Sequence, residues 1–172
     1  STGRSKAGCT SNSTTRALAS GLHPCTPEHL ARARAFVQAL DADLGGTEIA
    51  AALARAHQTL GTTASADIFL ITDGEVGAWQ AVVQGATVPG RRIFTVGVGS
   101  AVAEAFVRSL AAQTGGACEL VSPNEAMAER MLRHFERLRA ARARSAHLRW
   151  PEGAEQADPP RLDAIFDGDT VL

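Results

Sequence analysis

The stretch Ile68-Phe69-Leu70-Ile71-Thr72-Asp73-Gly74 joins a continuous apolar run of strand length to a carboxylate and a glycine. Such a run predicts a strand of a parallel sheet that is covered on both faces. Upstream, Gly45-Gly46-Thr47 predicts a helix start at which the threonine is the N-cap. A hydroxyl at a helix start and a carboxylate at a strand end can meet at one rim of an α/β sheet and bind a hard divalent cation, which takes oxygen ligands. Thr47 and Asp73 are therefore the candidate metal ligands.

Composition limits the classes of protein to consider. The chain has 172 residues, 45% of them hydrophobic, which is enough for one domain with a sizeable core. No stretch approaches the roughly 20 apolar residues of a membrane span. The formal net charge of −1 gives no global attraction to nucleic acid. Lys6 is the only lysine, tyrosine is absent, and the chain has neither a phosphate-binding loop nor a nucleophile elbow. These absences exclude most of the familiar catalytic chemistries, and we expect no nucleic-acid partner.

Helical and strand-like patterns alternate along the middle of the chain. The predicted helices cover 27–40 behind the N-cap Thr26, 47–61, 78–84, 102–114 and 122–143, and the predicted strands cover 67–72, 92–98 and 117–121. Apolar residues mark the expected inner faces of three helices: Leu30, Ala33, Val37 and Leu40; Phe106, Leu110 and Ala111; and Met127, Met131, Phe135 and Leu138. The alternation predicts an α/β fold, a three-layer, doubly wound and mostly parallel sheet.

The pattern changes after residue 144. A short strand is predicted over 147–150, a polar connection that contains prolines follows over 151–160, and the turn signal Asp167-Gly168-Asp169 lies near the end. The sequence therefore predicts three segments: a polar, disordered start (1–12), an α/β domain (13–144) and the start of a β-rich segment (145–172).

The order of these motifs resembles the later part of a von Willebrand factor type A domain. The resemblance rests on four features: Gly45-Gly46-Thr47 at a helix start, Ile68 to Gly74, Ile93-Phe94-Thr95-Val96-Gly97-Val98-Gly99, and Leu110-Ala111 with Gly115-Gly116. It covers about Ser13 to Leu138 and is closest in character to bacterial relatives of inter-alpha-trypsin inhibitor heavy chains. It implies a non-catalytic, protein-binding module that serves in adhesion or as a scaffold.

In that family a metal-ion-dependent adhesion site takes a D-x-S-x-S motif from the first strand, a threonine before a later helix and an aspartate after the fourth strand. Thr47 and Asp73 match the last two contributions, whereas residues 1–24 contain no D-x-S-x-S. The resemblance implies a domain that lacks its first strand, with 13–22 as what remains of the third strand. The strand over 68–72 would then have an unpaired edge.

The same resemblance implies a cofactor and a partner. The intact domain would bind Mg²⁺, or Mn²⁺ or Ca²⁺, and the ion would take an acidic side chain from a partner protein as a further ligand. Magnesium favours octahedral oxygen coordination, and one hydroxyl with one carboxylate leaves most positions to water. We therefore expect weak or no metal binding by this chain alone.

Two alternatives remain open. Gly97-x-Gly99 follows a predicted strand, opens a helix and precedes Glu119 by about 20 residues, as in a dinucleotide-binding enzyme, although Val102 occupies the third glycine position. The other alternative is an interaction module that needs no metal and uses helix faces and loops. The last helix carries a run of arginines that we expect on its solvent face: Arg130, Arg133, Arg137, Arg139, Arg142 and Arg144. Neither the five histidines nor the three cysteines show metal-ligand spacing, and we assign them no function.

Overall fold

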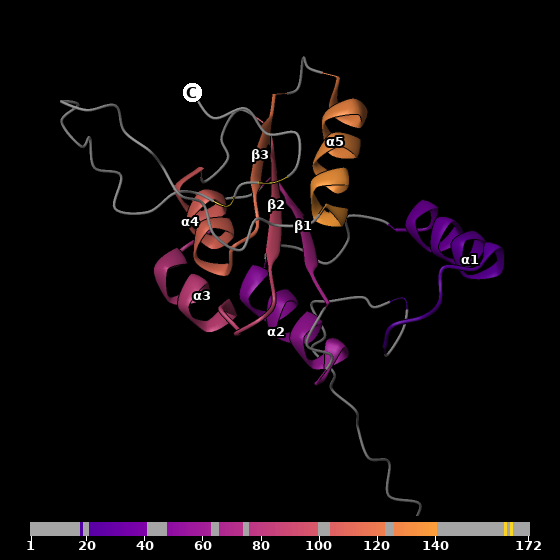
Figure 1. Cartoon of the computed structure of the whole chain (residues 1–172), viewed down its shortest axis with the longest axis horizontal. Helices are drawn as coiled ribbons and strands as arrows, with labels where there is room; N and C mark the ends of the chain where they lie inside the picture. The colour runs from indigo at the N-terminus through magenta and orange to yellow at the C-terminus, as the bar shows by residue number, and fades with distance from the viewer. Residues whose placement is uncertain are drawn as a thin grey trace, which may run out of the picture. The chain divides into compact units, whose positions relative to one another are not determined.

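Figure 1 shows the computed structural model of the chain, which describes residues 18, 21–40, 48–62, 66–73, 76–99, 104–122, 126–140, 164 and 166. Its internal contacts divide the chain into two compact units, Ser1–Gly61 and Thr62–Leu172. None of the described helices is both long and apolar enough to cross a membrane. The start over 1–12 and the strand predicted over 147–150 lie outside the described residues, so the division into three segments stays a prediction.

The first unit contains α1 (Pro27–Gln38) and α2 (Ile49–Leu60). Thr26 caps α1 as predicted, because its hydroxyl accepts a hydrogen bond from the backbone N–H of His29 at 3.3 Å. In α2 the buried residues are Ile49 and Leu53.

The expected burial of the α1 stripe is wrong. No residue of α1 is buried, and Val37 is 64% exposed. Charged residues interrupt the apolar ones along this helix, as Glu28, Arg32 and Arg34 show, and they leave only a narrow apolar stripe. The sequence thus predicts the helix correctly but not the exposure of its side chains.

The second unit is built on a parallel sheet with the strand order β1 (Ile68–Thr72), β2 (Ile93–Val98), β3 (Cys118–Val121). The register pairs Ile68 with Ile93, and Thr95 with Cys118. The central strand, β2, is buried over 93–97, as its richness in β-branched residues predicts. The predicted α/β class with a parallel sheet is confirmed.

Helices cover this sheet on both sides (Figure 1). α3 (Trp79–Ala86) packs against α4 (Glu104–Thr114), and α4 contacts β2 and β3. α5 (Met127–Arg139) contacts the same two strands. The layered arrangement therefore follows the predicted one.

Two neighbouring residues of β2 show that α4 and α5 lie on opposite faces. The hydroxyl of Thr95 donates a hydrogen bond to the carbonyl of Val107 in α4 at 2.9 Å. The ring of Phe94 lies 5.8 Å from the ring of His134 in α5. Successive side chains of a strand point to opposite faces of the sheet, so the two helices cover different faces.

The predicted inner face and end of α4 are both confirmed. Phe106 and Leu110 are fully buried, and Ala111 is 2% exposed. The helix ends at Thr114, before Gly115 with its positive φ of 74°, and the N–H of Gly116 donates to the carbonyl of Ala111 at 2.9 Å. These residues hold α4 against β2 and β3.

β1 differs from the prediction of a strand covered on both faces. Residues 68–70 are half-buried and Ile71 is 51% exposed. Among the residues that the structure describes, β1 pairs with β2 alone, so one of its edges has no neighbouring strand there. Burial of an apolar strand depends on such neighbours, which accounts for the difference.

The start and the inner face of α5 also differ from the prediction. Its N-cap is Ala126, which makes no side-chain capping bond, and not Ser122. His134 is the buried residue of this helix, whereas Phe135 is 46% exposed. Arg130 and Arg137 lie next to Glu119 of β3, and the partly exposed Phe135 still contacts the sheet, since its ring lies 6.0 Å from the ring of Phe69.

Candidate functional site

The carboxyl ends of the three strands lie at one edge of the sheet, as in any parallel sheet. Asp73 follows β1 directly, Gly99 follows β2 and Ser122 follows β3. Asp73 is exposed to solvent, whereas Thr72 before it is buried. In open α/β sheets this edge is where ligands bind. The structure therefore places one predicted metal ligand, Asp73, at an accessible position on the expected edge.

Thr47, the other predicted ligand, lies outside the described residues. The expectation that it caps α2 is wrong, because the helix begins at Ile49 and its N-cap is Glu48, whose side chain makes no capping bond. Helix boundaries that differ by one or two residues are common, since the first turn holds few internal hydrogen bonds. The approach of Thr47 to Asp73 stays a prediction.

The described residues contain no group of three or more His, Cys, Asp or Glu side chains that could hold a metal ion. Asp73 therefore belongs to no such group among the described residues. A cation there would need the Thr47 hydroxyl, water or a partner's oxygen atoms to fill its coordination shell. This donor set is compatible with Mg²⁺ but predicts weak binding.

Glu119 of β3 holds α5 to the sheet. Its Oε1 accepts a hydrogen bond from Arg130 at 2.8 Å, and its Oε2 lies 3.8 Å from Nη1 of Arg137. Two of the arginines predicted to face solvent therefore face the sheet instead, because a carboxylate on β3 attracts them. Arg133 and Arg139 are exposed, as predicted.

The pairing of Glu119 disfavours the dinucleotide-binding alternative. That role requires a carboxylate that is free to accept hydrogen bonds from a ribose. Both oxygens of Glu119 instead face arginine side chains, and the residue lies within β3. Titration with NAD, followed by the fluorescence of Trp79, would test this alternative directly, and no quenching is expected.

His134 is a structural residue that the sequence analysis did not single out. It is 1% exposed, and its ring lies 5.6 Å from the ring of Phe69 and 5.8 Å from that of Phe94. A signal was present in the sequence: His134 follows Met127 by seven positions and Met131 by three, which places it on the apolar face. The residue was missed because histidine is not one of the apolar residue types from which an inner helix face is predicted.

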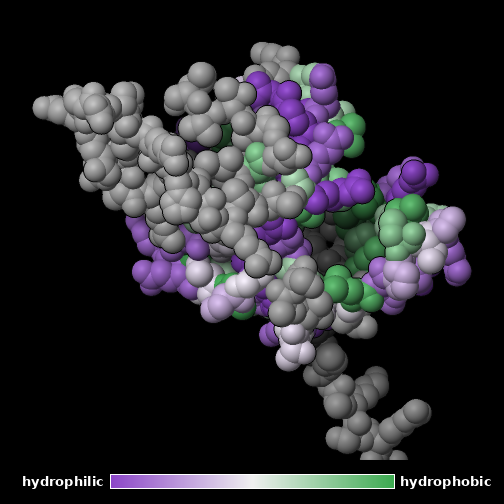
Figure 2. Space-filling view, in the orientation of Figure 1, coloured by the Kyte–Doolittle hydropathy of each residue, from purple (hydrophilic) through white to green (hydrophobic). Residues whose placement is uncertain are grey.

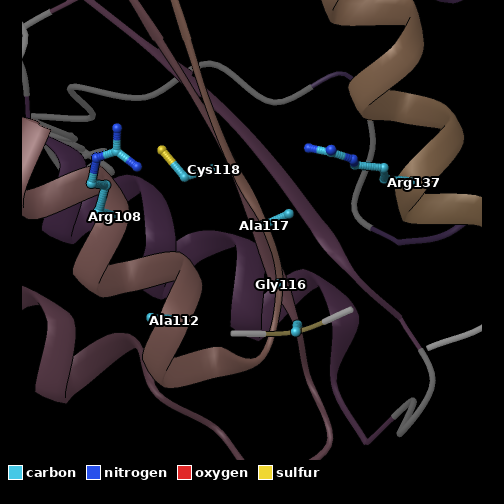
Figure 3. Close-up of a pocket in the computed structure, with 7 residues that line it drawn as sticks. Arg108, Ala112, Gly116, Ala117, Cys118 and Arg137 are labelled. Atoms are coloured by element: carbon cyan, nitrogen blue, oxygen red, sulfur yellow. The ribbon is translucent and has the colours of Figure 1, made fainter. Parts of the chain in front are cut away.

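A pocket of about 220 Å³ lies beside β3 (Figure 3). It is lined by Arg108, Arg137, Cys118, Gly116, Ala112, Ala117 and Ala164. Figure 3 shows the Arg108 side chain extending toward Cys118, with Arg137 on the other side of the strand. Both arginines have carboxylate partners, since Arg108 pairs with Glu104 at 2.6 Å and Arg137 lies near Glu119.

The thiol in this pocket is a poor nucleophile. Burial raises the pKa of Cys118, although a hydrogen bond with Thr95 and the charge of Arg108 oppose the increase. The thiolate is the reactive form of cysteine, so a raised pKa leaves little of it at neutral pH. The pocket therefore does not have the chemistry of a catalytic cysteine site.

Comparisons with known proteins agree with the fold and the motif order. A family profile described as von Willebrand factor type A domain matches residues 9–120. The chain is 30% identical over 110 residues to von Willebrand factor A domain-containing protein 5A of Rattus norvegicus, which covers 62% of this chain and 13% of that protein. It is 26% identical over 153 residues to the protein of the same name from Homo sapiens, covering 86% of this chain and 20% of that protein.

A von Willebrand factor A domain-containing protein of Dictyostelium discoideum is 25% identical over 152 residues, covering 84% of this chain and 18% of that protein. The chain thus spans a fifth or less of the length of these relatives. The predicted likeness to inter-alpha-trypsin inhibitor heavy chains stays a prediction. The profile match covers more than half of the chain, and the chain therefore belongs to the von Willebrand factor type A domain family.

Proposed function

We propose that the chain acts as a non-catalytic protein-binding module in which Asp73 and Thr47 contribute to a metal-ion-dependent adhesion site. Von Willebrand factor type A domains commonly mediate protein interactions, which supports the general assignment. In the proposed site Mg²⁺, or Mn²⁺ or Ca²⁺, is the resident ion. A carboxylate from a partner protein occupies one of its coordination positions, and the recognised chemistry is therefore an acidic side chain.

The observation that carries this proposal is the position of Asp73. The residue is exposed and directly follows β1, at the edge where parallel sheets bind ligands. A carboxylate and a hydroxyl are the hard oxygen ligands that Mg²⁺ prefers. A partner carboxylate would bind the ion with the strength of a charge-assisted contact.

The ligand count sets the expected affinity. Mg²⁺ keeps several water molecules when a protein offers only one or two ligands. Asp73 and Thr47 alone should give a dissociation constant of about 1 mM or weaker, by comparison with the weaker class of calcium sites. Mn²⁺ binds nitrogen and oxygen ligands more readily and is the more sensitive probe.

Isothermal titration with MgCl₂ and MnCl₂ tests the site, using the whole chain and the variants Asp73→Ala and Thr47→Ala. The expected result is a weak signal in the parent chain that both substitutions abolish. Glu136→Gln, which removes an exposed carboxylate from α5, is the matched control and should leave the signal unchanged. A signal that survives both ligand substitutions would show that the metal binds elsewhere.

A second candidate function is protein binding without a metal. It is favoured by exposed apolar side chains on β1 and α5, where Ile71 is 51%, Leu132 65% and Phe135 46% exposed. In Figure 2 the surface over α5 carries hydrophilic and hydrophobic residues side by side. The two candidates respond differently to chelation, because EDTA should abolish partner binding only if the metal site carries it. In the metal-independent case Leu132→Asp should weaken binding instead.

A further inference from the structure

The imidazole of His134 is buried against aromatic side chains of the sheet. The residue is 1% exposed, and its ring lies between the rings of Phe69 on β1 and Phe94 on β2. Neither Nδ1 nor Nε2 has a hydrogen-bond partner among the described residues. Such a ring is tolerated as the neutral species, but its protonated form would be a buried cation without an acceptor.

The charged groups around His134 are engaged with one another. On β3, Glu119 pairs with Arg130 and Arg137 of the same helix as His134. Ahead of β2 and β1, Arg92 pairs with Asp67, and the Arg92 guanidinium lies 5.1 Å from the ring centre of Phe94. Among the described residues, Glu119 is the carboxylate whose charge acts on the imidazole, and it already pairs with two arginines.

These surroundings lower the pKa of His134 below its ordinary value. Burial is the largest cause, the charge of Glu119 opposes it, and the charge of Arg137 adds to it. The backbones of Ala117 and Thr95 also favour the protonated form. Neither backbone, however, is within hydrogen-bonding geometry of a ring nitrogen.

We propose that protonation of His134 releases α5 from the sheet, so that the face of the sheet under α5 opens at mildly acidic pH. The proposal rests on the burial of an unpartnered imidazole at the centre of the contact between helix and sheet. His134 is the buried residue of α5, so the helix cannot stay docked and also hydrate a charged ring. Release would expose the ring of Phe69, whereas Phe94 would keep its contacts with Phe166 and Arg92. It would also break the hydrogen bond from Arg92 to Leu138 and leave the Glu119 carboxylate free of its arginines.

The transition should be local, because the rest of the second unit has a separate core. Phe106, Val107 and Leu110 of α4 are fully buried on the other face of β2 and β3. None of the ring contacts of His134 involves α4. Loss of α5 would therefore leave the packing of α3 and α4 on the sheet in place.

The direction of the pH effect follows from the two pKa values of His134. In the released helix the ring is in water and titrates near its ordinary value of 6.5. In the docked helix the pKa is lower, so the released state binds the proton first as the pH falls. Docking is therefore fully stable above about pH 6.5 and weakens below it, until the pH reaches the pKa of the docked ring. Between these two pKa values, uptake of one proton raises the ratio of released to docked helix about tenfold for each unit by which the pH falls.

Amide hydrogen exchange of the whole chain between pH 5 and 8, corrected for intrinsic exchange, tests the proposal. We expect the opening of α5 amides to increase about tenfold per pH unit below pH 6.5, while α4 amides show no such increase. His134→Met keeps an apolar side chain of similar size and should make α5 opening independent of pH. His23→Gln, at an exposed histidine of the first unit, is the matched control and should keep the parent behaviour.

A second measurement keeps the proposal testable if His134→Met does not fold. The pKa of His134 in the parent chain can be measured by NMR from its ring resonances, assigned through the backbone. A value below 6.5 supports the proposal, whereas a value at or above 6.5 overturns it. An unchanged pH dependence of α5 opening in folded His134→Met would overturn it equally.

Discussion

Asp67 and Arg92 are joined by three hydrogen bonds through both oxygens of the aspartate. The backbone N–H of Arg92 donates to Oδ1 at 3.3 Å, Nε donates to the same oxygen at 3.0 Å, and Nη2 donates to Oδ2. The same Nη2 donates to the carbonyl of Leu138 at 3.1 Å, in the last turn of α5. One guanidinium thus links the starts of β1 and β2 to the end of α5, and its hydrogen bond with Asp67 raises the pKa of Arg92.

Arg92→Met should destabilise the second unit by about 2 kcal/mol, because it leaves a largely buried carboxylate with only the backbone N–H of residue 92 and removes the side-chain donor of a helix-end carbonyl. The side chains of Arg92 and Asp67 are only 22% and 14% exposed. Arg108→Met is the matched control, since Arg108 and its partner Glu104 are 60% and 58% exposed, and it should cost less than about 1 kcal/mol. Urea denaturation followed by circular dichroism measures both, and equal losses would contradict the assignment.

Gly116→Ala should destabilise the chain strongly, by more than about 2 kcal/mol. A Cβ at this position would lie 2.1 Å from the backbone carbonyl oxygen of Ile93, so the connection from α4 to β3 could not stay as close to β2. Gly85→Ala is the control, because it lies within α3 and a Cβ there meets nothing within 4 Å. It should stabilise the helix by about 0.5 kcal/mol or more. Thermal denaturation of the two variants should therefore shift in opposite directions.

Leu110→Ala should cost about 2–5 kcal/mol, since it opens a cavity under α4 where the side chain is fully buried. Leu132→Ala removes the same atoms from α5 at a position that is 65% exposed. It should change the free energy of unfolding by about 0.5 kcal/mol or less. Similar losses in the two variants, measured by urea denaturation, would mean that Leu132 is covered in solution.

Cys25 should react with iodoacetamide at pH 8 much faster than Cys118. Cys25 is exposed, whereas burial raises the pKa of the Cys118 thiol and limits its access to the reagent. Peptide mapping by mass spectrometry gives both rates in one sample. Denaturation in urea is the control and should bring the two rates together. Preferential modification of Cys118 in the native protein would show that the β3 pocket is open and activates the thiol.

Local sequence signals were sufficient to predict the elements that bury one continuous surface. β2 is rich in apolar, β-branched residues, with Thr95 as its one polar position, and α4 repeats Phe106, Leu110 and Ala111 on one face. In these elements propensity, spacing and stop signals agree, so the sequence predicts both the type of element and its inner residues. Gly115 and Gly116, which follow α4, likewise predict where this helix ends.

The differences arose where burial depends on partners that are distant in sequence. The apolar run of β1 predicts a strand but not the exposure of Ile71, because exposure depends on what lies beside the strand. In α5 the sequence predicts the helix but not that Arg130 and Arg137 pair with Glu119, an interaction between different elements that helical periodicity does not contain. The candidate site is predicted in part: Asp73 lies at the expected edge, while the position of Thr47 stays a prediction.

The order of the strands across the sheet is the same as their order along the chain. Each pairing among the described strands therefore closes a single crossover between consecutive strands. Parallel strands pair only after such a crossover has formed, so this sheet should assemble more slowly than a hairpin of the same size. Both pairings converge on β2, so these three strands can form one sheet only when β2 is in place.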